Sequence, residues 1–283
     1  MASALSVSKS GMLVPMTLVR VARRYAYLWW VFIKNSLALE MEYRAATLSE
    51  SFIALTNMAW QLATIWVFFE HTDQLGGWDL WEAAIVLGLF IFFDGFIEMF
   101  FRPNMEQIIE HIRMGTLDFT LLKPVNSQFL ATTRFVRFRY AGYLVTGLGL
   151  ILYSLLRVEM QPSVWVILFF IALLVSGAII LYSMLLVLVT LAFWFINVTN
   201  IIELIWSVYE AGRVPIDTFP GVVRIFLTFV VPIAFITTIP AEALLGRVNP
   251  LFASLSLLMA AASLAVSSAF WRYAIQHYSS ASS

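Results

Sequence analysis

The sequence predicts an all-α integral membrane protein with six transmembrane helices. Composition and the lengths of the apolar segments support this prediction. Of the 283 residues, 61% are hydrophobic and 12% are charged, whereas a soluble domain has roughly 45–50% apolar and about 25% charged residues. A chain this poor in charge needs lipid around it, so we treat 1–283 as a single transmembrane domain.

Residues 16–44 are predicted to form a helix that lies along the membrane surface. Lys34 interrupts the apolar run, and basic residues are mixed with aromatic ones, among them Tyr25, Tyr27, Trp29 and Trp30. This mixture is typical of an interfacial helix, although an ordinary soluble cap would also fit. Because no signal-peptide pattern is visible, we expect the mature chain to begin near Met1, with 1–49 cytoplasmic or interfacial.

Most of the remaining chain divides into apolar segments that can cross a bilayer, whose core of about 30 Å needs roughly 20 helical residues. Four such segments are 51–69, 83–101, 140–156 and 254–271. The run from Val164 to Tyr209 is too long for one span at about 1.5 Å per residue. We divide it at the polar sequence INVTN (196–200) into two helices, 163–194 and 199–213.

The segment 215–247 is predicted to be a re-entrant hairpin on the outer side. It contains three prolines, Pro220, Pro232 and Pro240. A proline inside a helix removes a backbone donor and kinks the helix, and broken backbone at membrane depth is stable only where protein or a water-lined cavity covers it. A single kinked span is the alternative.

The distribution of basic residues predicts the orientation. Of 17 lysines and arginines, thirteen lie in the N-terminal segment, the 102–139 loop and the C-terminal segment, and four lie in the opposite loops. Basic residues concentrate in cytoplasmic loops. Both termini and the 102–139 loop are therefore expected in the cytoplasm.

The 102–139 loop is predicted to be a folded element. Asn104 is a candidate N-cap for a helix whose apolar residues share one face, namely Met105, Ile108, Ile109 and Ile112. Gly115 is expected to end this helix. A second short element, 116–122, should then end before Lys123-Pro124, because the residue before a proline is disfavoured in a helix.

Several short motifs resemble those of permease subunits of the ABC type-2 export family. They are Glu42-Tyr43-Arg44-Ala45, Gly115-Thr116-Leu117-Asp118, Leu122-Lys123-Pro124, Phe219-Pro220, Pro232 and Pro240. The expected topology resembles that family more specifically than any single motif: an N-terminal interfacial helix, a cytoplasmic coupling helix between spans two and three, and a re-entrant hairpin before span six. The resemblance is strongest to the branch in which two related permeases share one ATPase.

By this resemblance, 113–124 is the coupling element that binds a separate nucleotide-binding subunit. The residues implied are Gly115, Thr116, Leu117, Asp118, Phe119, Leu121, Lys123 and Pro124. Leu117, Phe119 and Leu121 would be the apolar anchors. The implied partners are two copies of an ATP-binding ABC subunit, a second permease, identical or related, and membrane lipid, at the bacterial inner membrane. A folded loop without a partner is the alternative.

Four polar side chains fall inside the first two spans: Asn57, Gln61, Asp94 and Glu98. Each pair is one helical turn apart. Acidic residues within a membrane are costly and suggest function, so Asp94 and Glu98 are candidates for a substrate path. They also have a structural interpretation, because Glu98 can pair with a nearby arginine, Arg102, Arg137 or Arg139. Asn57 and Gln61 can instead hydrogen-bond a neighbouring helix.

The sequence lacks the usual signatures of catalysis. The patterns G-x-x-x-x-G-K-[ST], H-E-x-x-H and G-x-S-x-G do not occur, so the chain contains neither a P-loop nor these hydrolytic sites. There is no cysteine, and the three histidines lie in different segments. We therefore expect no catalytic residue, metal or cofactor, and the net charge of zero gives no basis for binding nucleic acid.

The leading hypothesis is the membrane subunit of an ATP-driven exporter that acts as a dimer. Its substrate path would follow the subunit interface, lined by spans one, two and five, with 215–247 as the outer gate. The alternative is a secondary transporter or channel that needs no ATPase. Such proteins often contain internal repeats with paired broken helices, and the prolines here cluster in one region only. A membrane-embedded enzyme would need a cluster of catalytic residue types, which we do not find.

Overall fold

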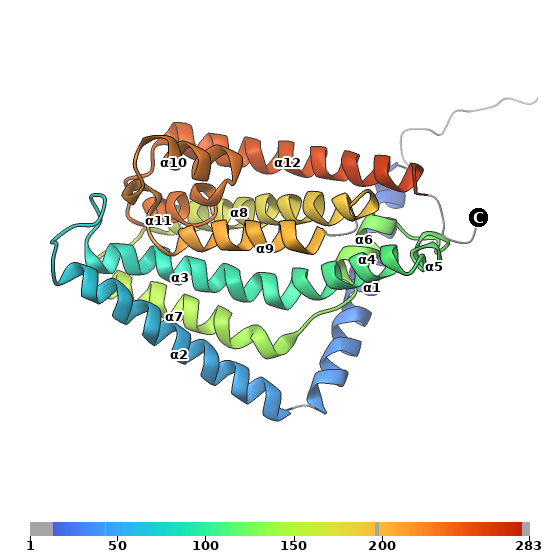
Figure 1. Cartoon of the computed structure of the whole chain (residues 1–283), viewed down its shortest axis with the longest axis horizontal. Helices are drawn as coiled ribbons and strands as arrows, with labels where there is room; N and C mark the ends of the chain where they lie inside the picture. Colours follow the sequence, from blue (N-terminus) through green and yellow to red (C-terminus); the bar gives the residue numbers. More distant parts are fainter. Residues whose placement is uncertain (1–13, 43, 196–197, 279–283) are drawn as a thin grey trace, which may run out of the picture.

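The computed structural model describes residues 14–42, 44–195 and 198–278, which form an elongated bundle of helices (Figure 1). Within these ranges, β pairing is limited to one isolated bridge between Leu75 and Trp78. In this described part of the chain, five helices are long and apolar enough to cross a membrane, or six when a bent pair near the C-terminus is counted as one span. The all-helical membrane fold is therefore confirmed, with five to six candidate spans.

The first half of the chain contributes the N-terminal helix and two long spans. Their elements are α1 (Val14–Met41), α2 (Arg44–Phe69), α3 (Leu80–Phe96), the π-turn η1 (Ile97–Phe101) and α4 (Arg102–Arg113). The last three are continuous, so the second span extends over Leu80–Arg113. The end of the bundle that contains 102–139 is called the loop end below, and it lies on the right in Figure 1.

Asn104 does not begin a helix, contrary to the sequence prediction. The helix continues through Pro103, which cannot donate to the Met99 carbonyl; that carbonyl instead accepts from the N–H of Arg137 at 2.9 Å. The buried Asn104 side chain donates to the carbonyls of Phe100 at 2.7 Å and Phe135 at 2.8 Å. Since the freed backbone group finds a partner in the same loop, the proline does not end the helix.

The middle of the chain folds largely as expected. Its elements are α5 (Asp118–Leu121), α6 (Ser127–Thr133), η2 (Phe138–Tyr140), α7 (Ala141–Arg157), α8 (Val164–Thr190) and η3 (Leu191–Phe193). The predicted spans 140–156 and 163–194 correspond to α7 and α8–η3. Helix α6 was not predicted.

The predicted fifth span, 199–213, is shorter than a bilayer core. It comprises α9 (Val198–Tyr209) and the 3-10 turn η4 (Glu210–Arg213). The twelve residues of α9 rise about 18 Å and the four residues of η4 about 8 Å, less than a core of about 30 Å. The first residues of the predicted turn, 196–197, lie outside the described residues.

The segment 215–247 forms two short helical pieces bent by 65° at a break. The elements are η5 (Ile216–Thr218), α10 (Gly221–Ile225), η6 (Phe226–Val230), η7 (Ile233–Phe235) and α11 (Thr238–Leu244), followed by the long α12 (Pro250–Gln276). Pro232 lies at the break. Pro240 does not kink α11, because it lies in the first turn, where backbone N–H groups lack helical acceptors.

Helix α3 is the centre of the bundle. Most of its residues are buried, and its most extensive contacts are with α7, while α8 packs mainly on α12. Its N-terminus is fixed by a capping box, in which Asp79 accepts from the N–H of Glu82 at 2.8 Å and Glu82 accepts from that of Asp79 at 3.2 Å. The core therefore holds the second span rigidly between the loop end and the opposite end.

Candidate functional site

The loop end contains a fixed corner between α4 and α5. Gly115 has a φ of +66°, a conformation that glycine adopts without steric cost. Its N–H donates to Ile112 at 3.2 Å, and the N–H of Thr116 donates to His111 at 2.9 Å. These two bonds are the Schellman pattern that ends a helix, so Gly115 ends α4 as predicted.

The predicted apolar anchors of 113–124 differ in exposure. Leu117 is only 1% exposed, so its side chain packs inside this chain and is not a contact for a partner. Phe119 is 71% exposed, and Leu121 is half-buried. Two further exposed apolar residues, Met114 and Leu122, lie within five residues of Phe119, and neither was predicted to be an apolar anchor. The exposed apolar set at this corner is Met114, Phe119 and Leu122.

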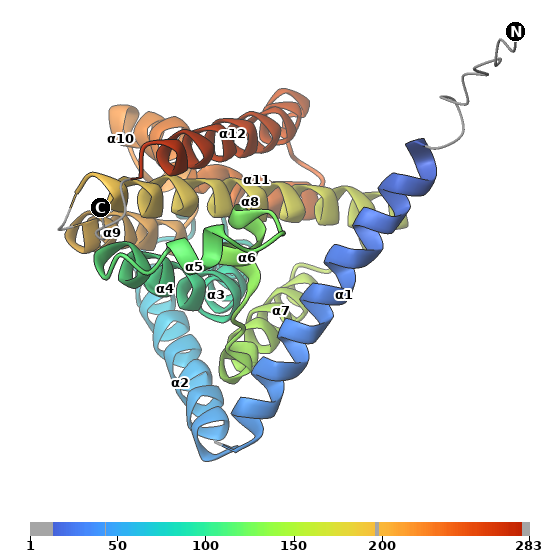
Figure 2. The same ribbon diagram turned by 90° about the vertical axis from the view of Figure 1, so that its right-hand side faces the viewer.

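Helix α1 lies across the loop end and is bonded to the 102–139 loop (Figure 2). Arg24 donates to the carbonyl of Pro124 at 2.8 Å, and the Tyr25 hydroxyl accepts from the N–H of Asn126 at 3.1 Å. Further along α1, Glu40 accepts from the N–H of Arg139 at 2.9 Å. Burial raises the pKa of the Glu40 carboxyl, and the hydrogen bond and charge of Arg139 oppose that shift.

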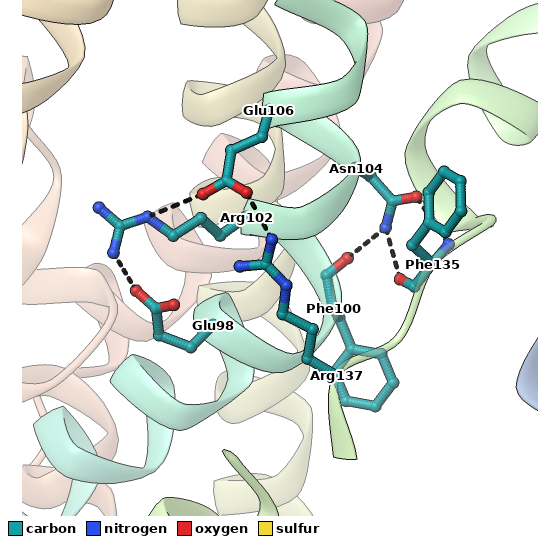
Figure 3. A network of polar contacts seen from close by, with 7 residues as sticks. All are labelled: Glu98, Phe100, Arg102, Asn104, Glu106, Phe135 and Arg137. Atoms are coloured by element: carbon teal, nitrogen blue, oxygen red, sulfur yellow. Dashed lines mark hydrogen bonds and ion pairs between the residues drawn. The ribbon is translucent and has the colours of Figure 1, made fainter. Parts of the chain in front are cut away.

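An ion-pair network follows the second span into this loop (Figure 3). Arg102 pairs with Glu98 and lies 3.8 Å from Glu106, and Arg137 bonds Glu106 at 2.5 Å. Of the three arginines considered from the sequence, Arg102 is therefore the one that pairs with Glu98. The observed pairing favours a structural role for Glu98.

Replacing Glu98 by glutamine is expected to lower stability while leaving transport by the surviving protein intact. The Arg102 guanidinium would lose its closest charged partner, a carboxylate whose side chain is 15% exposed, a loss of about 1–3 kcal/mol. Thermal unfolding of the purified chain measures the change. Glu110→Gln is the matched control, because Glu110 lies 3.9 Å from Arg113 with both side chains exposed, and such pairs contribute little. Wild-type stability with loss of transport would contradict the structural role.

A cavity of about 360 Å³ opens between α2, α3 and α9. The four polar residues selected from the first two spans all line it: Asn57, Gln61, Asp94 and Glu98. Asn57 donates to the hydroxyl of Tyr143 on α7 at 3.1 Å, as the hydrogen-bonding alternative predicted. A role for these residues in transport stays a prediction.

Helix α9 and η4, which correspond to the predicted span five, contribute a polar stripe to the cavity, and the sequence analysis selected none of its residues. Glu203, Trp206, Glu210 and Arg213 line it together with the buried Tyr209. Their spacing of three and four residues, in a segment that is otherwise apolar, puts them on one helical face. That spacing was a usable signal in the sequence.

The end opposite the loop end is held by contacts between the α2–α3 connection and both limbs of 215–247. Trp78 donates to Asp217 at 2.9 Å, and Arg247 bonds Glu82 at 3.0 Å while its guanidinium lies 4.0 Å from the Trp78 ring centre. The first and last parts of 215–247 therefore lie at the same end of the bundle, on the left in Figure 1. Of the three prolines assigned to an outer gate, Pro220 begins α10, Pro232 marks the bend and Pro240 is buried in α11.

Long apolar helices around a polar cavity, together with a folded loop at one end, are the features of a multi-pass membrane transport protein. The family model described as "ABC-2 family transporter protein" matches residues 55–282. The chain belongs to this family of membrane transport components and is a transporter permease. The comparison with curated proteins finds no match, and neither does the comparison with solved structures.

Proposed function

We propose that this chain is the membrane subunit of an ATP-driven exporter in the bacterial inner membrane. The match of the ABC-2 family model over residues 55–282 carries the proposal. Permeases of this family generally work with an ATPase subunit and dimerise, and this sequence contains no P-loop. The complex would contain two copies of an ATP-binding subunit and a second permease, identical or related.

The 113–124 corner is the proposed contact with the ATPase. Its exposed apolar side chains, Met114, Phe119 and Leu122, can enter a groove on a partner, while Leu117 and the Gly115 turn fix their position from inside. The bonds from α1 to Pro124 and Asn126 brace the loop. A braced element passes a rigid-body movement to the spans, whereas a loose loop would absorb it.

We propose that the loop end is cytoplasmic and that 215–247 is a re-entrant hairpin acting as the outer gate. The excess of basic residues at the loop end supports the orientation. The contacts of Asp217 with Trp78 and of Arg247 with Glu82 support a segment that enters and leaves the membrane on one side. Single cysteines in place of Lys123 and Gln74 would report the orientation; labelling of Lys123→Cys from outside the cell would contradict it.

Purification of the tagged chain from membranes of its native cells tests the function. We expect an ATP-binding subunit to co-purify in a one-to-one ratio with permease chains, and the complex to hydrolyse ATP. The alternative, a secondary transporter, predicts a permease that purifies without an ATPase and transports substrate in vesicles energised by an ion gradient alone. That second result would refute the proposal.

A further inference from the structure

We propose that the cavity between α2, α3 and α9 binds an amphipathic organic cation, with the Asp94 carboxylate as its counter-charge. The inference rests on the proposed function, because it names the substrate class of that permease. Four observations support it: the charge balance of the cavity, the depth of Asp94, two polar atoms without partners, and the aromatic walls.

The cavity has more negative than positive groups. Four carboxylates line it, Asp94, Glu98, Glu203 and Glu210, with two arginines, Arg102 and Arg213. The arginines are already occupied: Arg102 pairs with Glu98 and lies 3.9 Å from Glu203, and Arg213 bonds Glu210 at 3.0 Å.

Asp94 is left without a partner. No hydrogen bond or ion pair joins its carboxylate to another residue within 14–42, 44–195 and 198–278. It lies fourteen residues after Leu80, the first residue of α3, which is about 21 Å along the helix axis and therefore inside a core of about 30 Å. A carboxylate at this depth is costly and is normally paired. A cationic ligand would supply the missing charge.

Two further polar atoms on the cavity wall point to a ligand. Tyr209 is 1% exposed, and its hydroxyl has no hydrogen-bond partner among the described residues. The Oε1 atom of Gln61 is also buried and unpartnered in that part of the chain. Buried polar groups without partners are rare in folded proteins.

The aromatic walls suit a cation that also has apolar surface. The guanidinium carbon of Arg102 lies 5.6 Å from the Trp206 ring centre, and that of Arg213 lies 5.4 Å from the Phe90 ring centre. These contacts show that the wall already accommodates cations over aromatic faces. Trp60 and Tyr143 add further aromatic surface, and a volume of about 360 Å³ falls in the range of small-molecule sites.

The arrangement fits an organic cation better than a metal ion. A metal site needs several oxygen or nitrogen ligands that converge on one point. Among the residues that the structure describes, no group of three or more Asp, Glu or His side chains is close enough to hold a metal. The acidic groups are instead spread along the wall, where they can attract a larger ion without enclosing a small one.

Binding of tetraphenylphosphonium to the purified full-length chain tests the inference. Tetraphenylborate has nearly the same size and shape but the opposite charge. We expect equilibrium dialysis in detergent micelles, after subtraction of protein-free micelles, to show saturable binding of the phosphonium and at least tenfold weaker binding of the borate. Asp94→Asn should weaken phosphonium binding about tenfold or more.

Asp73→Asn is the matched control, because it removes one carboxylate from an exposed position in the α2–α3 connection and should bind like wild type. Equal binding of the two ions by the wild-type chain would overturn the inference even if a variant failed to fold. So would unchanged phosphonium binding by a folded Asp94→Asn variant. The measurement needs neither ATP nor an ATPase. If the chain co-purifies with its ATPase but binds the phosphonium no better than the borate, the cation inference is wrong while the proposed exporter function stands.

Discussion

Replacing Phe119 by aspartate is expected to release the ATPase from the permease and to stop transport. Phe119 is 71% exposed on a four-residue helix, so the change should not disturb the fold of this chain. In a complex, the phenyl ring would be an apolar anchor, and such residues often contribute about 2 kcal/mol or more to binding. A buried carboxylate in its place adds a desolvation cost. The combined loss corresponds to a drop in affinity of about 30-fold or more.

The measurement is the amount of ATPase retained per membrane-inserted permease during purification. Phe119→Leu is the matched control, because it keeps an apolar side chain and should retain most of the ATPase. Leu122→Asp should behave like Phe119→Asp, since Leu122 is 81% exposed in the same loop. If both aspartate variants keep the ATPase as well as wild type does, the 113–124 corner is not the contact.

Replacing Gly147 by alanine is expected to destabilise the bundle by about 2–4 kcal/mol. Helix α7 packs on α3 at this residue. A Cβ atom there would lie 2.6 Å from the backbone nitrogen of Phe92 and 2.7 Å from the carbonyl oxygen of Gly88. Both contacts are with backbone atoms, which cannot relieve a clash by a change of rotamer as a side chain can. The two helices would have to separate along the most extensive contact of the fold.

Gly149→Ala is the internal control for this change. Gly149 lies in the same helix, two residues further on, and no atom lies within 4 Å of a Cβ placed there. Its replacement should be neutral, or stabilising by up to about 1 kcal/mol, since alanine favours a helix more than glycine does. Thermal unfolding of both variants in one detergent measures the difference. Equal unfolding temperatures would show that α3 and α7 do not meet as closely as these distances indicate.

The sequence identified polar residues where they interrupt an apolar segment. Asp94 and Glu98 were visible because acidic residues are rare in apolar segments, and the cavity indeed brings them together with Asn57 and Gln61. The opposite wall belongs to the predicted span five, but the sequence analysis selected none of its side chains. Glu203, Trp206, Glu210 and Arg213 lie in a segment whose composition is ordinary for a helix end, and only their common face relates them to the cavity.

Other predictions failed where a local rule was outweighed by a distant contact. Asn104 has the side chain of an N-cap, but the backbone of Phe135, 31 residues away, engages it inside the helix. Leu117 was predicted to be an apolar anchor for a partner, yet its side chain is only 1% exposed. In both cases, the outcome depends on where a second segment of the chain lies. The sequence pattern of one segment does not give that position.

The sequence by itself determined that the chain is a helical membrane protein, which apolar segments form its long helices, and that Gly115 turns the chain after α4. These features follow from composition, segment length and backbone preference, which are properties of contiguous residues. Only the tertiary structure decided which side chains share the cavity, which apolar residues of 113–124 face outward, and that both limbs of 215–247 meet the α2–α3 connection. These features depend on contacts between residues far apart in the chain, because a side chain's environment is set by whatever helix packs against it.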